Sequence, residues 1–224
     1  MDLTFNKIEE RVVAALIEKG LTTPDYYPLT LNALTAACNQ KSNRNPVLAL
    51  DETTVARTLD ALRERQLVRM VSGAEMRVPK YYHLFPEAGE FSEPEVAVLA
   101  ELMLRGPQTI GELRGRASRM HEFTELSQVE TVLLGLADRE SGPVVKKLER
   151  QAGHKESRYA HLLAGEPELL EDAQKNAEIP LEGARVQIVA ENERMDQLEQ
   201  EIGQLRSELE EIHQQFSRFK EQFE

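Results

Sequence analysis

Histidine and cysteine supply most nucleophilic, acid–base and metal chemistry in proteins, and both are sparse in this sequence. The five histidines show no metal-ligand spacing; they are His83, His121, His154, His161 and His213. The sequence contains no glycine-rich phosphate loop, nucleophile elbow or H-E-x-x-H motif. The single Cys38 excludes an internal disulfide and a multi-thiolate zinc site. We therefore expect a protein that is not an enzyme and that holds no metal and no cofactor.

Arginine and threonine recur between residues 53 and 62 at a spacing that suits contact with nucleic acid. Thr54, Arg57 and Thr58 fall on one face of a predicted helix. The opposite face is apolar and consists of Val55, Leu59 and Leu62. Arginine can pair with guanine edges in the major groove, and threonine can contact phosphate or the thymine methyl group. The alternative is a solvated helix face, because acidic residues alternate with these side chains along the helix.

Other cations flank this helix. Arg69, Arg77 and Lys80 lie in the extended segments that follow it and could contact phosphates without reading sequence. A second basic set lies further along the chain and consists of Arg114, Arg116, Arg119, Lys146 and Lys147. It could clamp phosphates, although a charged protein surface explains it as well. Residues 127–137 carry no cation, so the second corresponding helix is a poor candidate for reading DNA.

The first 165 residues contain the same design twice. "VVAALIEKG" (12–20) returns as "AVLAELMLRG" (97–106), and "TTVARTLDAL" (53–62) returns as "SQVETVLLGL" (127–136). "PLTLNAL" and "KYYHLF" also have counterparts in the same order, "PQTIGEL" and "RYAHLL". Four matches in one order indicate a structural repeat. His83 and His161 occupy equivalent positions in it, which favours packing over catalysis.

Each copy is predicted to hold three helices followed by a β-hairpin. Asn6, Thr30 and Asp51 are N-cap candidates in the first copy. The second copy has three candidate capping boxes, which are Ser92/Glu95, Thr109/Glu112 and Ser127/Glu130. Three helices and a hairpin form the winged-helix variant of the helix-turn-helix. We expect an α+β fold that is mainly α, with winged-helix domains at 1–86 (the first copy) and 87–165 (the second copy).

The sequence resembles the YceH-like family of bacterial proteins in residues 1–165. The resemblance rests on "TTPDYYPLTLNALTAACNQKSNRNPV", "LMLRGPQTIGELRGRASRMHEF" and "KYYHLF", whose long polar loop and "GELRGRASRM" have unusual compositions. It implies a tandem winged-helix fold in a family whose biochemical function is not established.

The C-terminal part of the chain has a heptad pattern that predicts a coiled coil at 188–224, after a linker with a short helix at 166–187. Apolar residues alternate three and four positions apart. The candidate dimerisation residues are Met195, Leu198, Ile202, Leu205, Leu209, Ile212, Phe216 and Phe219. We expect a homodimer; the alternative is one amphipathic helix that folds back on the rest of the chain.

The charge is unevenly distributed. The net charge is −12, and residues 166–224 carry 16 acidic and 6 basic residues, a net of −10. The first 165 residues carry 23 acids and 21 bases and can hold local basic patches. No apolar run is long enough for a membrane span and no export signal is visible, so we expect a cytoplasmic protein without a membrane partner.

Two binding functions fit these features. One is binding of double-stranded DNA, as in a transcriptional regulator. The alternative is a protein–protein scaffold that resembles the winged-helix accessory subunits of chromosome-condensation complexes. The near-neutral body and the acidic tail favour the scaffold, whereas the threonine and arginine face favours DNA.

The loop "ACNQKSNRNP" (37–46) is long for a helix-turn-helix connection. Its amides can form side-chain-to-backbone bonds that build the loop. Lys41 and Arg44 do not help a turn to close, so we expect both to project from a polar surface and to contact a ligand, most simply phosphate.

Overall fold

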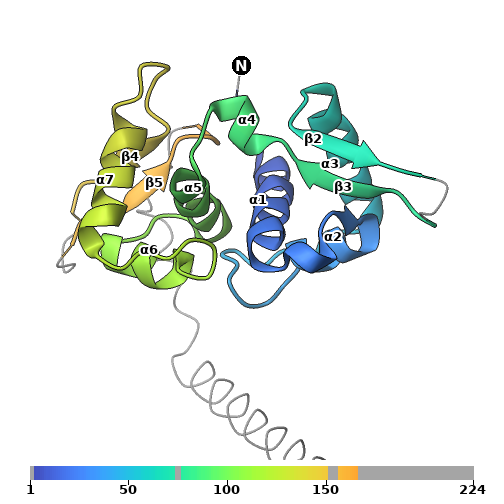
Figure 1. Ribbon diagram of the computed structural model, residues 1–224, viewed down its shortest axis with the longest axis horizontal. Helices are drawn as coiled ribbons and strands as arrows, with labels where there is room; N and C mark the ends of the chain where they lie inside the picture. The colour runs from blue at the N-terminus through green and yellow to red at the C-terminus, as the bar shows by residue number, and fades with distance from the viewer. Residues whose placement is uncertain (1–2, 74–76, 151–155, 166–224) are drawn as a thin grey trace, which may run out of the picture. The chain divides into compact units, whose positions relative to one another are not determined.

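The computed structural model describes residues 3–73, 77–150 and 156–165 (Figure 1). All of these residues belong to one compact unit, Met1–Pro167. The linker predicted at 166–187 and the coiled coil predicted at 188–224 lie outside the described residues. The described part is α+β and mainly helical, with two small antiparallel sheets. None of its helices combines the length and the apolar character that a membrane crossing requires.

The first copy has three α-helices and a three-stranded sheet. Its helices are α1 (Lys7–Thr22), α2 (Leu31–Cys38) and α3 (Glu52–Glu64), with a short 3₁₀ helix, η1 (Pro24–Tyr26), after α1. Its strands are β1 (Leu29–Thr30), β2 (Val68–Val71) and β3 (Lys80–His83). β2 and β3 form the predicted hairpin, with Arg69 opposite Tyr82, and β1 adds an unpredicted third strand on the other edge of β3.

The second copy follows the same order after a connecting helix, α4 (Phe85–Gly89). Its helices are α5 (Glu93–Arg105), α6 (Ile110–Ala117) and α7 (Leu126–Ala137). Its strands β4 (Val145–Lys147) and β5 (Tyr159–His161) pair antiparallel, with Val145 opposite His161. The predicted order of three helices and a hairpin is therefore present in both copies.

Side-chain caps fix most helix starts. The side chains of Asn6, Thr30 and Asp51 accept hydrogen bonds from the first turns of α1, α2 and α3, as predicted. The capping boxes of α5 and α6 are also confirmed. The box predicted at Ser127 is wrong, because α7 begins at Leu126 with Glu125 as its N-cap. The N–H of Glu125 donates to Gln128 Oε1 (3.3 Å), and Ser127 lies inside the helix.

The core is shared by the two copies. α1 and α5 lie side by side in the middle of the described part, with α3 and its hairpin on one side and α7 on the other (Figure 1). Residues 11–18 of α1 and 96–104 of α5 are buried without interruption. A helix that is buried on every side belongs to the centre of a core. One hydrophobic cluster therefore joins both copies, and the outward faces of α3 and α7 remain available to solvent.

Candidate functional site

The outward face of α3 presents an arginine, Arg57, that forms no ion pair with any other residue the structure describes. Arg57 is exposed, while the residues on the opposite face (Val55, Leu59 and Leu62) are fully buried. The threonine hydroxyls are engaged within the helix, since Thr54 Oγ1 donates to Asp51 Oδ2 (3.1 Å) and Thr58 Oγ1 donates to the carbonyl of Thr54 (2.8 Å). Among the three predicted side chains, only Arg57 can reach far from the helix surface.

Two of the three acidic residues on α3, Glu52 and Asp60, contact neighbouring side chains. Asp60 Oδ1 lies 2.9 Å from Arg63 Nη1 in a pair one turn apart. Glu52 Oε1 accepts a hydrogen bond from Asn32 Nδ2 of α2 (3.0 Å). Both contacts are at the surface and contribute little stability. They turn two carboxylates toward local donors, which reduces their repulsion of an anion that approaches Arg57.

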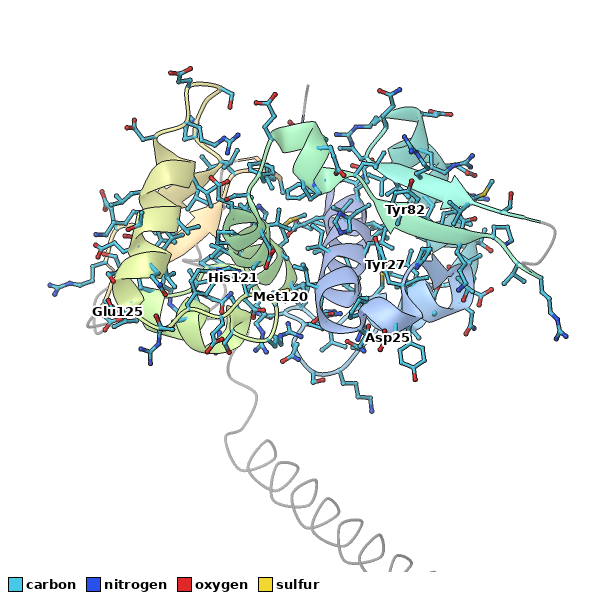
Figure 2. All side chains as sticks on the ribbon, in the orientation of Figure 1. Asp25, Tyr27, Tyr82, Met120, His121 and Glu125 are labelled. Atoms are coloured by element: carbon cyan, nitrogen blue, oxygen red, sulfur yellow. The ribbon has the colours of Figure 1, made fainter. Side chains whose placement is uncertain are left out.

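The β2–β3 hairpin adds three more cations. Arg69 and Lys80 lie on the same face of the hairpin, because Arg69 faces Tyr82 and Lys80 faces Val71 in the register. The guanidinium carbon of Arg69 lies 5.9 Å from the centroid of the Tyr82 ring, which Figure 2 shows on β3. Arg77 is exposed near the turn. None of these three forms an ion pair within the part of the chain that the structure describes.

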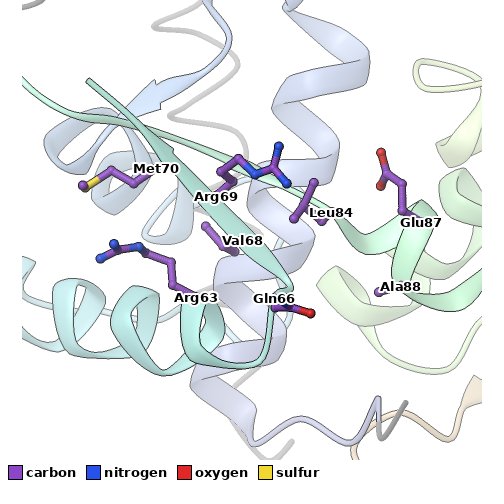
Figure 3. A pocket seen from close by; sticks show the side chains of 8 residues that line it. All are labelled: Arg63, Gln66, Val68, Arg69, Met70, Leu84, Glu87 and Ala88. Carbon is purple, nitrogen blue, oxygen red and sulfur yellow. The ribbon is translucent and has the colours of Figure 1, made fainter. Parts of the chain in front are cut away.

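A groove of about 730 Å³ lies beside this surface. Arg63 enters it from α3, Arg69 from β2 and Glu87 from α4 (Figure 3). Gln66 also lines it, together with the apolar residues Val68, Met70, Leu84 and Ala88. The groove therefore offers both charged and apolar contacts.

The prediction that Arg44 projects from a polar surface is wrong. Arg44 is 6% exposed, and its guanidinium pairs with Glu18 of α1 through both carboxylate oxygens. It also donates to the carbonyls of Ala37 (2.9 and 3.2 Å) and Asn43 (2.9 Å). Glu18 is buried in an apolar helix and needs a counter-charge, which explains why the arginine turns inward. Lys41 is exposed, as predicted.

The amides of the α2–α3 connection (residues 39–51) build it, as predicted, but they also join it to the second copy. Asn39 Nδ2 donates to the carbonyl of Leu50 (2.7 Å), and the N–H of Leu50 donates to Asn39 Oδ1 (2.8 Å). Asn43 Oδ1 accepts from Arg105 at the end of α5. The N–H of Asn45 donates to the carbonyl of Leu104 (2.9 Å). The length of this connection is what lets it reach the carboxyl end of α5.

A buried ion cluster lies where the two copies meet. Glu18 of α1 pairs with Arg44 and Arg119, and Glu101 of α5 pairs with Arg119 (3.0 Å) and Arg105 (2.7 Å). Burial opposes ionisation of Glu18, but the hydrogen bonds and charges of Arg44 and Arg119 outweigh it and hold the pKa of this carboxyl below its usual range. This cluster was not predicted from the sequence, although each apolar run contains a glutamate, Glu18 and Glu101, which is a visible signal.

The second basic set is partly engaged in internal pairs. Arg119 belongs to the buried cluster, and Arg116 pairs with Glu112 (3.3 Å) and donates to Gln108 Oε1 (2.8 Å). Arg114 is exposed on α6, and Lys146 and Lys147 are exposed on β4. The structure does not bring these five residues together as one free patch, because two of them neutralise carboxylates.

The two equivalent histidines have different surroundings. Burial lowers the pKa of His83 to about 4, and its backbone N–H donates to the hydroxyl of Tyr27 (2.8 Å). His161 Nε2 lies 2.9 Å from Glu10 Oε1. No group of three or more metal-ligating side chains occurs in the described ranges. Both histidines are packed in their copies, as their positions in the repeat indicated.

Residues 5–154 match the family described as "Protein of unknown function, DUF480". A UPF0502 protein of Geobacter sulfurreducens is 54% identical over 224 residues, which covers 100% of both chains. A UPF0502 protein of Geotalea uraniireducens is similar to the same extent, with 54% identity over 100% of both chains. A UPF0502 protein of Opitutus terrae is 53% identical over 161 residues, which is 72% of this chain and 70% of that protein.

Proposed function

Since the chain belongs to the DUF480 family of proteins of unknown function, in agreement with its resemblance to YceH-like proteins, we propose that it binds double-stranded DNA without catalysis. In this proposal both copies are winged helices, and α3 of the first copy enters the major groove. The observation that supports the proposal is a difference in ion pairing between cations of the two copies. Arg57, Arg69, Arg77 and Lys80 make no ion pair among the described residues, whereas Arg116 and Arg119 of the second copy do.

The residues have separate roles. Arg57 is the only base-reading candidate on α3 with a long side chain, and it would pair with a guanine edge. Thr54 and Thr58 pack along the major groove of the DNA, where their methyl groups can contact a thymine methyl. Arg69, Arg77 and Lys80 on the hairpin bind phosphates beside the major groove of the DNA, and Lys41, exposed on the α2–α3 connection, binds a further phosphate.

The heptad predicted at 188–224 pairs two chains in a parallel coiled coil. A dimer would present two α3 helices to one duplex and would double the number of phosphate contacts. The acidic tail then serves association between chains, and the basic residues of the first copy serve DNA.

Salt dependence of binding to a random-sequence duplex tests the proposal. With the four cations Lys41, Arg69, Arg77 and Lys80 on phosphates, log K should fall with log salt with a slope of about −3 to −4 for each chain. Removing one phosphate contact, as in Lys80→Ala, should reduce the slope by about 1. Lys147→Ala of the second copy is the matched control and should leave the slope unchanged. Absence of binding at low salt would reject DNA binding and leave the protein-scaffold function.

A further inference from the structure

We propose that the outward face of α7 is the docking surface for a basic, amphipathic segment of a partner protein. This face is defined by four residues spaced i, i+4, i+7 and i+8, which are Ser127, Thr131, Leu134 and Gly135. All four are exposed, and they lie opposite the buried residues Val129, Leu133 and Leu136. The inference does not depend on DNA binding by α3.

The centre of this face is uncharged and carries an exposed leucine. Leu134 is 58% exposed, and Leu126 at the start of the same helix is 49% exposed. The corresponding residues of α3 in the repeat are Asp60 and Glu52, which are acidic. A solvent-facing helix surface normally carries charges. Depletion of charge at the centre, with large apolar side chains left exposed, is typical of a protein interface.

Gly135 is a second and independent indication. It lies inside α7, and a Cβ placed on it would meet no atom within 4 Å. Nothing in the described part of the chain therefore requires glycine there, although glycine in a helix interior is less stable than alanine. A glycine beside an exposed leucine lets the backbone of another element approach closely. α3 has Ala61 at the corresponding position.

The charge around the face selects the kind of partner. The stretch from Met120 to Asp138 contains no lysine or arginine, and its acidic residues are Glu122, Glu125, Glu130 and Asp138. All four are exposed, and Figure 2 shows Glu125 at one end of α7. None of them forms an ion pair among the described residues. A second copy of α7 would set carboxylates against carboxylates, whereas lysine or arginine around an apolar centre would be complementary.

The test uses the full chain and a fluorescent amphipathic peptide of leucine and lysine. Binding is measured by anisotropy at physiological ionic strength, and the methyl resonances of Leu126 and Leu134 are followed by NMR. The parent should bind the peptide, both methyl groups should shift, and Leu134→Asp should weaken binding about tenfold or more. Asp60→Asn on α3 is the matched control and should leave the affinity unchanged. A peptide of equal charge with glutamine in place of leucine should bind more weakly.

Gly135→Ala separates docking from folding. The substitution should raise Tm by about 2–4 °C, because alanine favours the helix, and at the same time weaken peptide binding. Four results would overturn the proposal: unchanged binding by Leu134→Asp, unshifted methyl groups, equal binding of the glutamine peptide, or unchanged binding by Gly135→Ala. A Leu134→Asp variant that turns a dimer into a monomer in sedimentation would also overturn it, because α7 would then pair with a second copy.

Discussion

The two copies bury the same positions and expose different ones. Val55 and Leu59 of α3 correspond to Val129 and Leu133 of α7, and all four are fully buried. On the outward faces, Arg57 and Asp60 of α3 are replaced in α7 by Thr131 and Leu134, in the same register. Packing in the core restricts the buried positions to apolar residues of similar size. The outward positions are free to differ, and the two proposed partners, DNA at α3 and a basic segment at α7, rest on this difference.

The connections between the second and third helices differ in the same way. The first copy uses residues 39–51 and the second uses residues 118–125. Both connections send an arginine to Glu18, since Arg44 comes from the long one and Arg119 from the short one. The longer connection also contacts the end of α5 through Asn43 and Asn45. The two copies therefore share a set of charges as well as a core, and the repeat is held as one body.

The largest expected effect on stability comes from removing the carboxylate of Glu18, with which an arginine of each connection pairs. Glu18→Ala would leave the guanidinium of Arg44 buried without its carboxylate, which should lower the free energy of unfolding by about 3–5 kcal/mol. Asp60→Ala is the control, because its pair with Arg63 is exposed and should contribute less than about 1 kcal/mol. Urea denaturation measures both. Equal, small losses in the two variants would mean that the cluster does not hold the copies together.

The next largest effect is expected for the two equivalent histidines, His83 and His161, and concerns the pH dependence of stability. The pKa of His83 is lowered to about 4 by burial, and Glu87 opposes this shift only weakly. Because an unfolded histidine has a pKa near 6.5, His83 binds a proton more strongly in the unfolded chain than in the folded one. The stability that His83 contributes is present above pH 6.5 and is lost as the pH falls toward 4, by about 3 kcal/mol in total.

His83→Gln should remove this loss, as measured by urea denaturation at several pH values between 7 and about 4. His161→Gln is the matched control, because Glu10 already places a carboxylate oxygen 2.9 Å from that ring. If the pH dependence disappeared in His161→Gln and persisted in His83→Gln, then His161 and not His83 would cause the loss of stability at low pH.

A smaller effect should separate the two connections. Asn39→Ala removes both hydrogen bonds to Leu50 and should lower the free energy of unfolding by about 1–3 kcal/mol. Ser118→Ala in the second connection removes one exposed bond to the carbonyl of Gly115 and should have less effect. Thermal unfolding of both variants measures the difference. A larger loss in Ser118→Ala would contradict a structural role for the amides of the long connection.

The smallest effect on stability is expected on the outward faces, where the effect on binding should be largest. Arg57→Ala should change the free energy of unfolding by less than about 0.5 kcal/mol and weaken duplex DNA binding. Thr131→Ala at the corresponding position of α7 should leave DNA binding unchanged. Electrophoretic mobility shift and calorimetry on the same samples compare the two. Equal effects on DNA binding would argue against different use of the two copies.

The sequence by itself determined the local features of this protein. The starts of α1, α2, α3, α5 and α6 follow from Asn6, Thr30, Asp51, Ser92 and Thr109, because a cap is a contact between residues two or three positions apart. The apolar period of α3 also placed Arg57 outside correctly. α7 was predicted two residues late, since the sequence offers two capping pairs there and the helix uses Glu125 with Gln128.

Only the tertiary structure decided which polar residues are available to a partner. Arg44 and Lys41 stand three positions apart in one polar loop, and nothing local separates a buried cation from an exposed one. Arg44 turned inward because Glu18, 26 residues earlier, is buried beside the loop and needs a counter-charge. The pairing of β1 with β3 and the burial of α1 against α5 were also decided by tertiary contacts between distant segments. Each depends on which distant segments meet in space, and a charge is exposed or neutralised only after they have met.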